Sequence, residues 1–235
     1  MPKPFEQWTV LPHKPLHKLE ENLWMVQGKL GNIRRVMVVV RLGDGRLLVW
    51  NAIALDDAEM KELEAWGTPA FLVVPNGLHR MDARIWKQRY PSLTVIAPPG
   101  ARKKIEEVVA VDRTDGELGD ASVTLTFPAC AAAREALLEV RHAGGGTTVV
   151  INDLVMNQRP LGGFQGFVFN LLKFSGPTPS VSLPARLLLI KDKPGLKTLL
   201  QQLAATPDLK RVIVSHGETI ETGAAEGLRQ ALATF

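Results

Sequence analysis

Short apolar runs bounded by glycine, proline and charged residues predict a chain that alternates strands with helices. Gly43-Asp44-Gly45 stands between two apolar runs and predicts a hairpin turn. Asp56 and Asp57 can cap a helix that Gly67 ends. For the first half we expect strands at 23–27, 35–42, 46–50, 71–74 and 93–97, and helices at 56–66, 83–90 and 101–109.

The second half repeats this order. Three glycines at 144–146 predict the turn of its last hairpin, and Pro194 stands in the first turn of a helix, where proline is tolerated. The stripe predicted to be buried on that helix consists of Leu196, Leu199, Leu200 and Leu203. For this half we expect strands at 123–127, 136–141, 147–151 and 211–215, and helices at 194–205 and 221–233.

The order of elements predicts the fold class. Each half begins with strands joined by hairpins, which are antiparallel, and ends with a strand–helix–strand unit. We therefore expect two mixed β-sheets packed face to face with helices outside, a four-layer α/β/β/α sandwich. A single doubly wound sheet is the alternative, and the hairpins count against it. The expected organisation is an N-terminal arm, 1–22, and one domain, 23–235, built of two similar halves at about 23–110 and 120–235.

Composition and charge argue against a nucleic-acid-binding, membrane-spanning or disulfide-bonded protein. Hydrophobic residues make up 46% of the 235 positions and charged residues 22%, as in an ordinary soluble protein. The net charge of +4 is scattered rather than gathered in a basic track, so we expect no nucleic-acid partner. No apolar stretch reaches the roughly 20 residues that a membrane span needs. Cys130 is the only cysteine, which excludes an intramolecular disulfide, and we expect a cytoplasmic protein.

Polar and titratable residues follow three of the predicted strands. The strand 71–74 runs into Pro75 and a polar loop, 147–151 runs into Asp153, and 211–215 runs into His216. The residues of interest in that polar loop are Asn76, His79, Arg80 and Asp82. Ligands and reactive groups of α/β proteins gather at the carboxyl ends of strands, so these residues predict one shared site.

Several separated motifs resemble the metallo-β-lactamase superfamily, the fold of many zinc-dependent hydrolases. The segment Pro75-Asn-Gly-Leu-His79 is similar to the Pro-Asn-x-x-His segment of one functionally uncharacterised branch. Further similar segments, in the expected order, are 51–57, 90–91, 97–100, 152–157 and 215–217. The resemblance covers nearly the whole chain from Leu23 onward and implies the same four-layer fold.

The metal ligands depart from the superfamily pattern. Its ligand loop is His-x-His-x-Asp-His, and neither alignment of that loop with 76–82 gives more than two ligands. The turn that supplies a further histidine corresponds to 128–133, which has none, and we expect the nearby His142 at the surface. The resemblance matches only Asp153, as the bridging aspartate, and His216, as the final histidine.

Two functions remain open. In the first, the protein keeps the fold but does not catalyse a reaction. Arg80 then pairs with Asp153 or Asp82 at the position where a metal would lie. Alternatively, Arg80 holds a small anionic ligand beside His79 and Asn76. The ligand-binding residues would then be Asn76, Arg80 and Asp82. In the second, the catalytic and metal-binding residues His79, Asp153 and His216 hold one zinc or iron ion, and water attacks an ester, thioester or phosphoester. A full dinuclear zinc centre is not expected.

The segment 161–174 is the most apolar of the chain and contains three glycines. We expect a buried helix or a cover over the cleft, which the glycines would make mobile. The alternative is an exposed patch that forms a homodimer or receives a greasy substrate.

Overall fold

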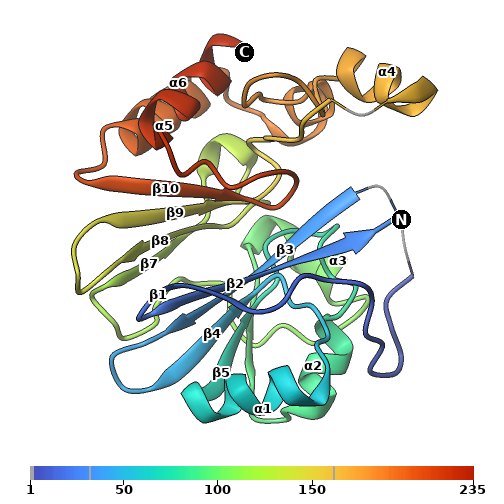
Figure 1. The fold of residues 1–235 in the computed structure, drawn as a ribbon, viewed down its shortest axis with the longest axis vertical. Coiled ribbons are helices and arrows are strands. Elements are labelled where there is room, and N and C mark those ends of the chain that lie inside the picture. The colour runs from blue at the N-terminus through green and yellow to red at the C-terminus, as the bar shows by residue number, and fades with distance from the viewer. Residues whose placement is uncertain (1–2, 32, 161) are drawn as a thin grey trace.

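Two β-sheets form the centre of the protein in the computed structural model, which describes residues 3–31, 33–160 and 162–235. The first sheet contains, in spatial order, β1 (His17–Glu20), β2 (Leu23–Leu30), β3 (Ile33–Arg41), β4 (Arg46–Trp50), β5 (Thr68–Val73) and β6 (Thr94–Ile96). The second contains β10 (Leu209–Val214), β9 (Thr147–Ile151), β8 (Leu137–Arg141) and β7 (Val123–Thr126). Figure 1 shows the sheets stacked one above the other.

Both sheets are mixed, as the hairpins predict. β1 to β4 pair antiparallel, and β5 and β6 then add parallel to β4. In the second sheet β7, β8 and β9 are antiparallel and β10 is parallel to β9. β1 comes from within the predicted arm and pairs with β2.

The helices lie between and after these strands. They are α1 (Asp57–Trp66), α2 (Ala83–Arg89), α3 (Arg102–Ile105), α4 (Gly163–Leu171), α5 (Lys193–Ala204) and α6 (Ala224–Ala233), with the short turns η1 (Pro99–Ala101), η2 (Ala129–Ala131) and η3 (Ala185–Leu189). Asp56 caps α1 as predicted, by accepting a hydrogen bond from the Glu59 amide at 2.9 Å. The helix predicted at 101–109 is wrong in length, because α3 ends at Ile105 and turns follow it.

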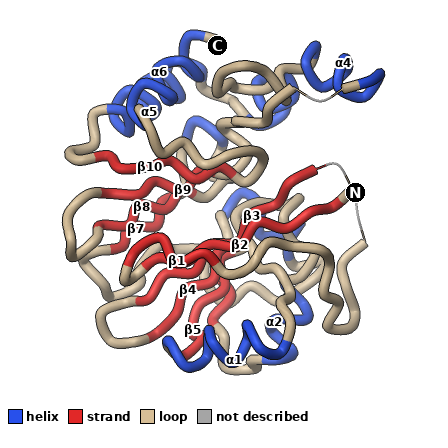
Figure 2. The backbone as a smooth tube through the Cα atoms, viewed as in Figure 1, coloured by secondary structure: helices blue, strands red, loops and turns tan. Residues whose placement is uncertain are grey.

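Three apolar clusters separate four layers. The central cluster lies between the sheets and takes Val38 and Val73 from the first sheet and Leu138 and Ile213 from the second. A second cluster packs the first sheet against α1 and α2, and a third packs the second sheet against α5 and α6. The helices therefore cover the outer faces of the stacked sheets (Figure 2). This arrangement confirms the α/β/β/α sandwich.

The pairing of strands also positions the site. Since β5 lies among parallel strands and β9 and β10 are parallel to each other, the polar segments after these strands emerge at common sheet edges. None of the helices in the described ranges combines the length and apolarity that crossing a lipid bilayer requires.

Candidate functional site

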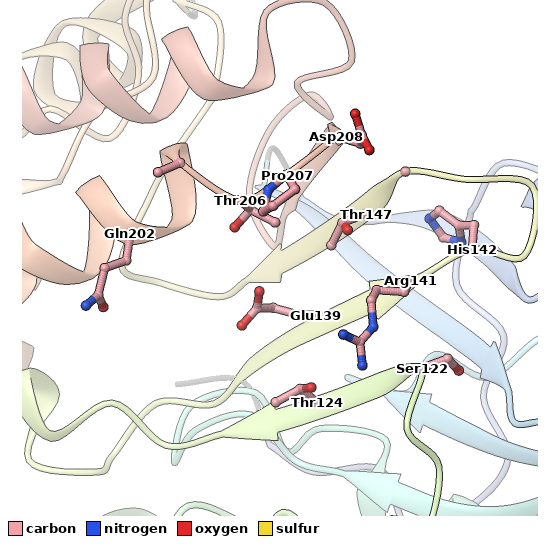
Figure 3. A pocket seen from close by; sticks show the side chains of 12 residues that line it. Ser122, Thr124, Glu139, Arg141, His142, Thr147, Gln202, Thr206, Pro207 and Asp208 are labelled. Atoms are coloured by element: carbon pink, nitrogen blue, oxygen red, sulfur yellow. The ribbon is translucent and has the colours of Figure 1, made fainter.

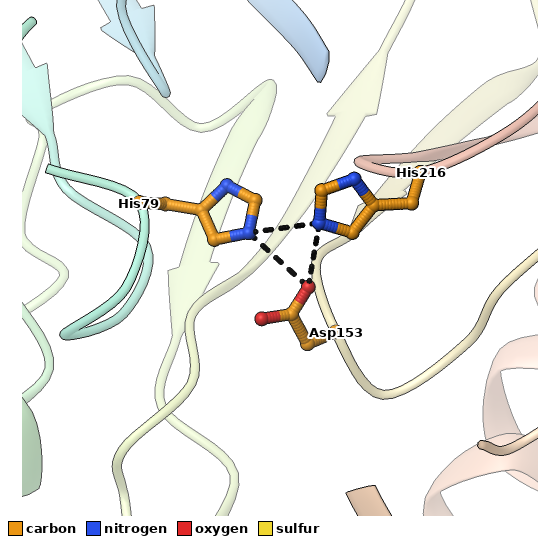
Figure 4. A group of neighbouring side chains, drawn as sticks. All are labelled: His79, Asp153 and His216. Carbon is orange, nitrogen blue, oxygen red and sulfur yellow. Dashed lines mark hydrogen bonds and ion pairs between the residues drawn. The ribbon is translucent and has the colours of Figure 1, made fainter. Parts of the chain in front are cut away.

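The side chains of His79, Asp153 and His216 meet at one point (Figure 4). The Nε2 atoms of the two histidines are 3.2 Å apart, and Asp153 Oδ1 lies 3.2 Å from His79 Nε2 and 3.4 Å from His216 Nε2. The three residues come from the loop before α2 and from the ends of β9 and β10. The predicted shared site at strand ends thus brings these three residues together.

The loop that carries His79 is shaped by Asn76. The Oδ1 atom of Asn76 accepts hydrogen bonds from the backbone amides of Leu78 at 2.8 Å and His79 at 3.0 Å. These bonds turn the chain back after Pro75, as asparagine side chains commonly do in turns. The turn directs the His79 ring towards Asp153.

Hydrogen bonds fix which ring nitrogen of each histidine carries a proton. His216 Nδ1 lies 2.6 Å from the carbonyl of Arg34, which only accepts, so Nδ1 donates. His79 Nδ1 lies 3.3 Å from Asn51 Oδ1, whose amide is oriented because Asn51 Nδ2 donates to the Val36 carbonyl at 2.7 Å. When the rings are neutral, both Nε2 atoms therefore direct a lone pair at the same point, as in histidines that ligate metals.

The three donor atoms fit a zinc ion. Zinc bonds of about 2.0–2.1 Å in a tetrahedral site place neighbouring ligand atoms about 3.3–3.4 Å apart. The observed separations between the two Nε2 atoms and Asp153 Oδ1 are 3.2–3.4 Å. Two lone pairs and a carboxylate oxygen repel one another unless a cation lies among them, and a proton can bridge only one pair of them at a time.

A second carboxylate, Glu135, lies directly behind the cluster. Asn76 Nδ2 donates to Asp153 Oδ2 at 2.7 Å and to Glu135 Oε1 at 2.8 Å, so one amide joins two acids. Glu135 is fully buried and also accepts bonds from Asn152 Nδ2 and the Asp153 amide. Glu135 was not predicted as a site residue, since it stands among alanines with no motif around it.

The charges of the cluster are strongly coupled. Burial raises the pKa of Asp153, but the positive charges and hydrogen bonds of His79 and His216 outweigh it and hold that pKa well below its usual range. Burial lowers the pKa of His216, and the hydrogen bond and charge of Asp153 outweigh it and raise that pKa. Burial and the neighbouring Asp153 charge raise the pKa of Glu135 well above its usual range. The site therefore favours positive charge between the imidazoles and Asp153.

Arg80 does not occupy the position predicted for it. Its guanidinium pairs with Glu107 at 2.9 Å and donates to the Lys104 carbonyl, so the predicted pairing with Asp153 or Asp82 is wrong. The physical reason is the turn at Asn76, which directs His79 inward and leaves the next residue facing α3. No guanidinium from Arg80 fills the point between the two histidines.

Asp82 is paired with Arg35, a residue that no sequence motif marks. Asp82 Oδ2 lies 2.7 Å from Arg35 Nη2, and Asp82 Oδ1 accepts from the Ala54 amide at 2.9 Å. Burial raises the pKa of Asp82 despite the attraction of Arg35. Asn76 and Asp82 were predicted to bind a ligand. Both polar atoms of each side chain instead contact other residues of the protein and hold the loop in place.

A pocket of about 850 Å³ opens over the cluster. Its walls include all three donors together with Asn76, Asp82 and Glu135, but Arg80 does not contribute to them. Apolar residues complete the walls, among them Leu78, Met156, Phe174 and Leu188. The cluster therefore has access to a ligand-sized space.

The apolar segment 161–174 is exposed, and residue 161 lies outside the described ranges. Phe164, Phe167 and Leu171 on α4 are 83%, 66% and 63% exposed, so the predicted burial is wrong. Figure 1 shows α4 projecting from the body of the protein, on the side of the second sheet where α5 and α6 lie. The helix has an apolar face with no partner from the described part of the chain, and Phe174 beyond its end lines the pocket.

A second pocket, of about 570 Å³, lies at the beginning of β9, at the end of the strand away from Asp153 (Figure 3). His142 lines it but is buried, and its ring nitrogens contact Asn22 Oδ1 at 2.7 Å and Thr148 Oγ1 at 2.8 Å. The predicted surface position of His142 is therefore wrong. None of the site residues predicted from sequence lines this pocket.

Comparison with known proteins places the fold. No protein-family model and no curated protein matches the sequence. Among solved structures, the chain is similar to the metallo-β-lactamase FIM-1 from Pseudomonas aeruginosa in its mono-zinc form, with 13% identity, a TM-score of 0.63 and coverage of 95% of this chain and 96% of that one. A metallo-β-lactamase from Erythrobacter litoralis with β-mercaptoethanol in its active site has 14% identity, a TM-score of 0.60 and coverage of 94% and 96%. DIM-1 metallo-β-lactamase has 12% identity, a TM-score of 0.62 and coverage of 95% and 99%. The protein has the metallo-β-lactamase fold.

Proposed function

We propose that the protein is a metal-dependent hydrolase that holds a single zinc or iron ion between His79, Asp153 and His216. The observation that carries the proposal is the convergence of three donor atoms, mutually 3.2–3.4 Å apart, around one point. Three histidine or carboxylate ligands with a remaining open position are typical of catalytic rather than structural zinc sites.

The surrounding residues support this role. The Arg34 carbonyl and Asn51 keep the protons of His216 and His79 on Nδ1, which leaves each Nε2 free to ligate. Asn76 holds Asp153 by its second oxygen, so Oδ1 stays directed at the histidines. Such outer contacts orient ligands and raise metal affinity. An ion held in this way supplies a Lewis acid that activates a water molecule near neutral pH.

The non-catalytic alternative has lost its main support. It required the Arg80 guanidinium between the acidic and histidine side chains, and Arg80 pairs with Glu107 instead. The pocket over the cluster is also large enough for an ester, thioester or phosphoester substrate. We therefore favour hydrolysis of one of these bonds, with the water attacking beside the cluster and the leaving group departing into the pocket.

Metal analysis tests the proposal. The protein is purified without chelator, dialysed against a small excess of zinc or ferrous iron, and analysed by plasma mass spectrometry together with Asp153→Ala, His216→Ala and His17→Ala. His17 is exposed on β1, so its variant is the matched control for adventitious surface binding. We expect about one ion per chain in the wild type and in His17→Ala, and none in the other two.

Hydrolysis is then measured on an aryl ester, a thioester and an aryl phosphodiester. We expect at least one of the three to be cleaved by the metal-loaded wild type and not by His216→Ala. Absence of bound metal in the wild type, or equal metal in all variants, would overturn the proposal.

A further inference from the structure

We infer that the pocket over the cluster receives an anionic amphiphile, a molecule with an aliphatic chain and a carboxylate or phosphate group. The inference deepens the proposed function by naming its substrate class, an acyl ester or thioester of that kind. It rests on the proposed function only in assuming that the bond to be hydrolysed lies at the cluster. The nature of the ligand follows from the walls of the pocket, whether or not a reaction occurs.

The first observation is that apolar side chains at the mouth of the pocket face solvent. Ile33, Leu78 and Leu188 line the pocket and are 40%, 52% and 66% exposed. They come from β3, from the loop before α2 and from η3, so the exposure is shared by three separate segments. Contiguous exposed apolar surface around a cavity is a mark of a ligand site.

Less exposed apolar residues line the same pocket. Met156, Phe174 and Leu189 line it and are partly or fully buried. An aliphatic chain in the cavity can therefore contact both the solvent-facing and the buried apolar residues. Each methylene buried in this way contributes about 0.8 kcal/mol, or roughly fourfold in affinity.

The second observation is a pair of uncompensated positive charges on the same pocket. Lys103 and Arg134 line it, and neither forms an ion pair with any described residue. Arg134 packs over η1, since a Cβ at Gly100 would lie 2.9 Å from Arg134 Cγ, and Lys103 follows three residues later in α3. The two cations thus stand on touching segments.

The acidic residues of the pocket are already engaged. Glu107 pairs with Lys104 and Arg80, and Asp82 pairs with Arg35. Glu135 and Asp153 both accept from Asn76. Lys103 and Arg134 therefore remain to attract an anionic group of a ligand. An apolar wall and two free cations on one cavity are complementary to an amphiphile that carries negative charge.

Equilibrium binding to metal-free protein tests this inference independently of catalysis. The probe is dansyl-undecanoate, followed by fluorescence and displaced with dodecanoate, dodecanol or butyrate. We expect dodecanoate to compete at least 100-fold more strongly than butyrate, because burial of only a few methylenes gives that ratio.

Two double variants separate the apolar from the charged contribution. In K103E/R134E we expect dodecanoate affinity to fall about tenfold while dodecanol affinity is unchanged. In I33S/L188S both should fall. The matched control is K61E/R229E, which changes the net charge equally on α1 and α6, outside the pocket, and should leave both affinities as in the wild type.

The outcomes distinguish this inference from the proposed function. Equal competition by butyrate and dodecanoate, or equal effects of the two charge variants, would overturn the ligand class. Binding to phosphatidylglycerol vesicles together with a failure of the free probe to bind would also overturn it, because the occupant would then be a bilayer. If dodecanoate binds as expected but no ester is hydrolysed, the ligand class stands and the hydrolase proposal fails.

Discussion

The loop between β5 and α2 and the ends of β9 and β10 meet at one site but differ in what they supply. The loop contains four polar candidates, and of these only His79 offers a metal-ligand atom to the cluster. Each of the strands β9 and β10 delivers its first titratable residue, Asp153 or His216, straight into it. A residue that follows a parallel strand immediately is placed by the sheet, whereas a residue in a loop is placed by whichever local contact dominates.

Asp82 of the loop forms a buried ion pair with Arg35. Asp82 is 2% exposed, so Arg35→Ala leaves a buried carboxylate without its partner. We expect a loss of about 3–5 kcal/mol in the free energy of unfolding, measured by urea denaturation. The double variant R35A/D82A should recover part of this loss. Full stability of Arg35→Ala would show that Ala54 alone holds the loop.

Asn76 is where the two regions are joined, and its removal should have the next largest effect. Asn76→Ala leaves Asp153 Oδ2 and Glu135 Oε1 each without a donor, which costs about 2–3 kcal/mol. Zinc affinity should fall about 10–100-fold, as is typical when an outer contact of a ligand is lost. Denaturation and zinc titration are compared with Asn170→Ala on the exposed face of α4. Equal zinc affinity in both variants would contradict the orienting role.

Glu135, behind the cluster, should make the stability of the protein depend on pH. Because burial raises its pKa in the folded state, its contribution to stability is complete below the unfolded-state value of about 4.3 and is lost as pH rises towards the folded-state pKa. Glutamine does not titrate, so Glu135→Gln lacks this pH-dependent loss of stability. The substitution can still change the free energy of unfolding by an amount that is the same at every pH. Unfolding of metal-free protein between pH 5 and 8 should therefore give a flatter curve for Glu135→Gln than for the wild type or Glu139→Gln. Parallel curves would contradict the raised pKa.

Arg80 should give the smallest effect, since its partner Glu107 is exposed. We expect Arg80→Ala to match the surface variant Lys61→Ala in the free energy of unfolding and the wild type in zinc affinity. Zinc titration and urea denaturation check this. A rise in zinc affinity would restore the idea that the Arg80 guanidinium competes with the ion.

The sequence allows the sheets, the outer helices and the meeting of three strand ends to be predicted, because apolar periodicity and strand polarity are local properties. The direction of Arg80 is not local: it depends on Glu107 and the Lys104 carbonyl, which belong to another segment. Glu135 and Arg35 were missed because their burial arises only when the sheets pack. The apolar composition of α4 predicts burial, but its phenylalanine and leucine side chains are exposed. Hydrophobicity alone does not show that an apolar face lies on the surface.

The cluster draws one donor from the first half of the chain and two from the second, so any cation seated there ties the two sheets together. Its binding free energy then opposes their separation, and the protein resists unfolding in proportion to the free concentration of that cation. A cell could in this way make the lifetime of the protein follow its supply of the ion, with no additional regulatory part.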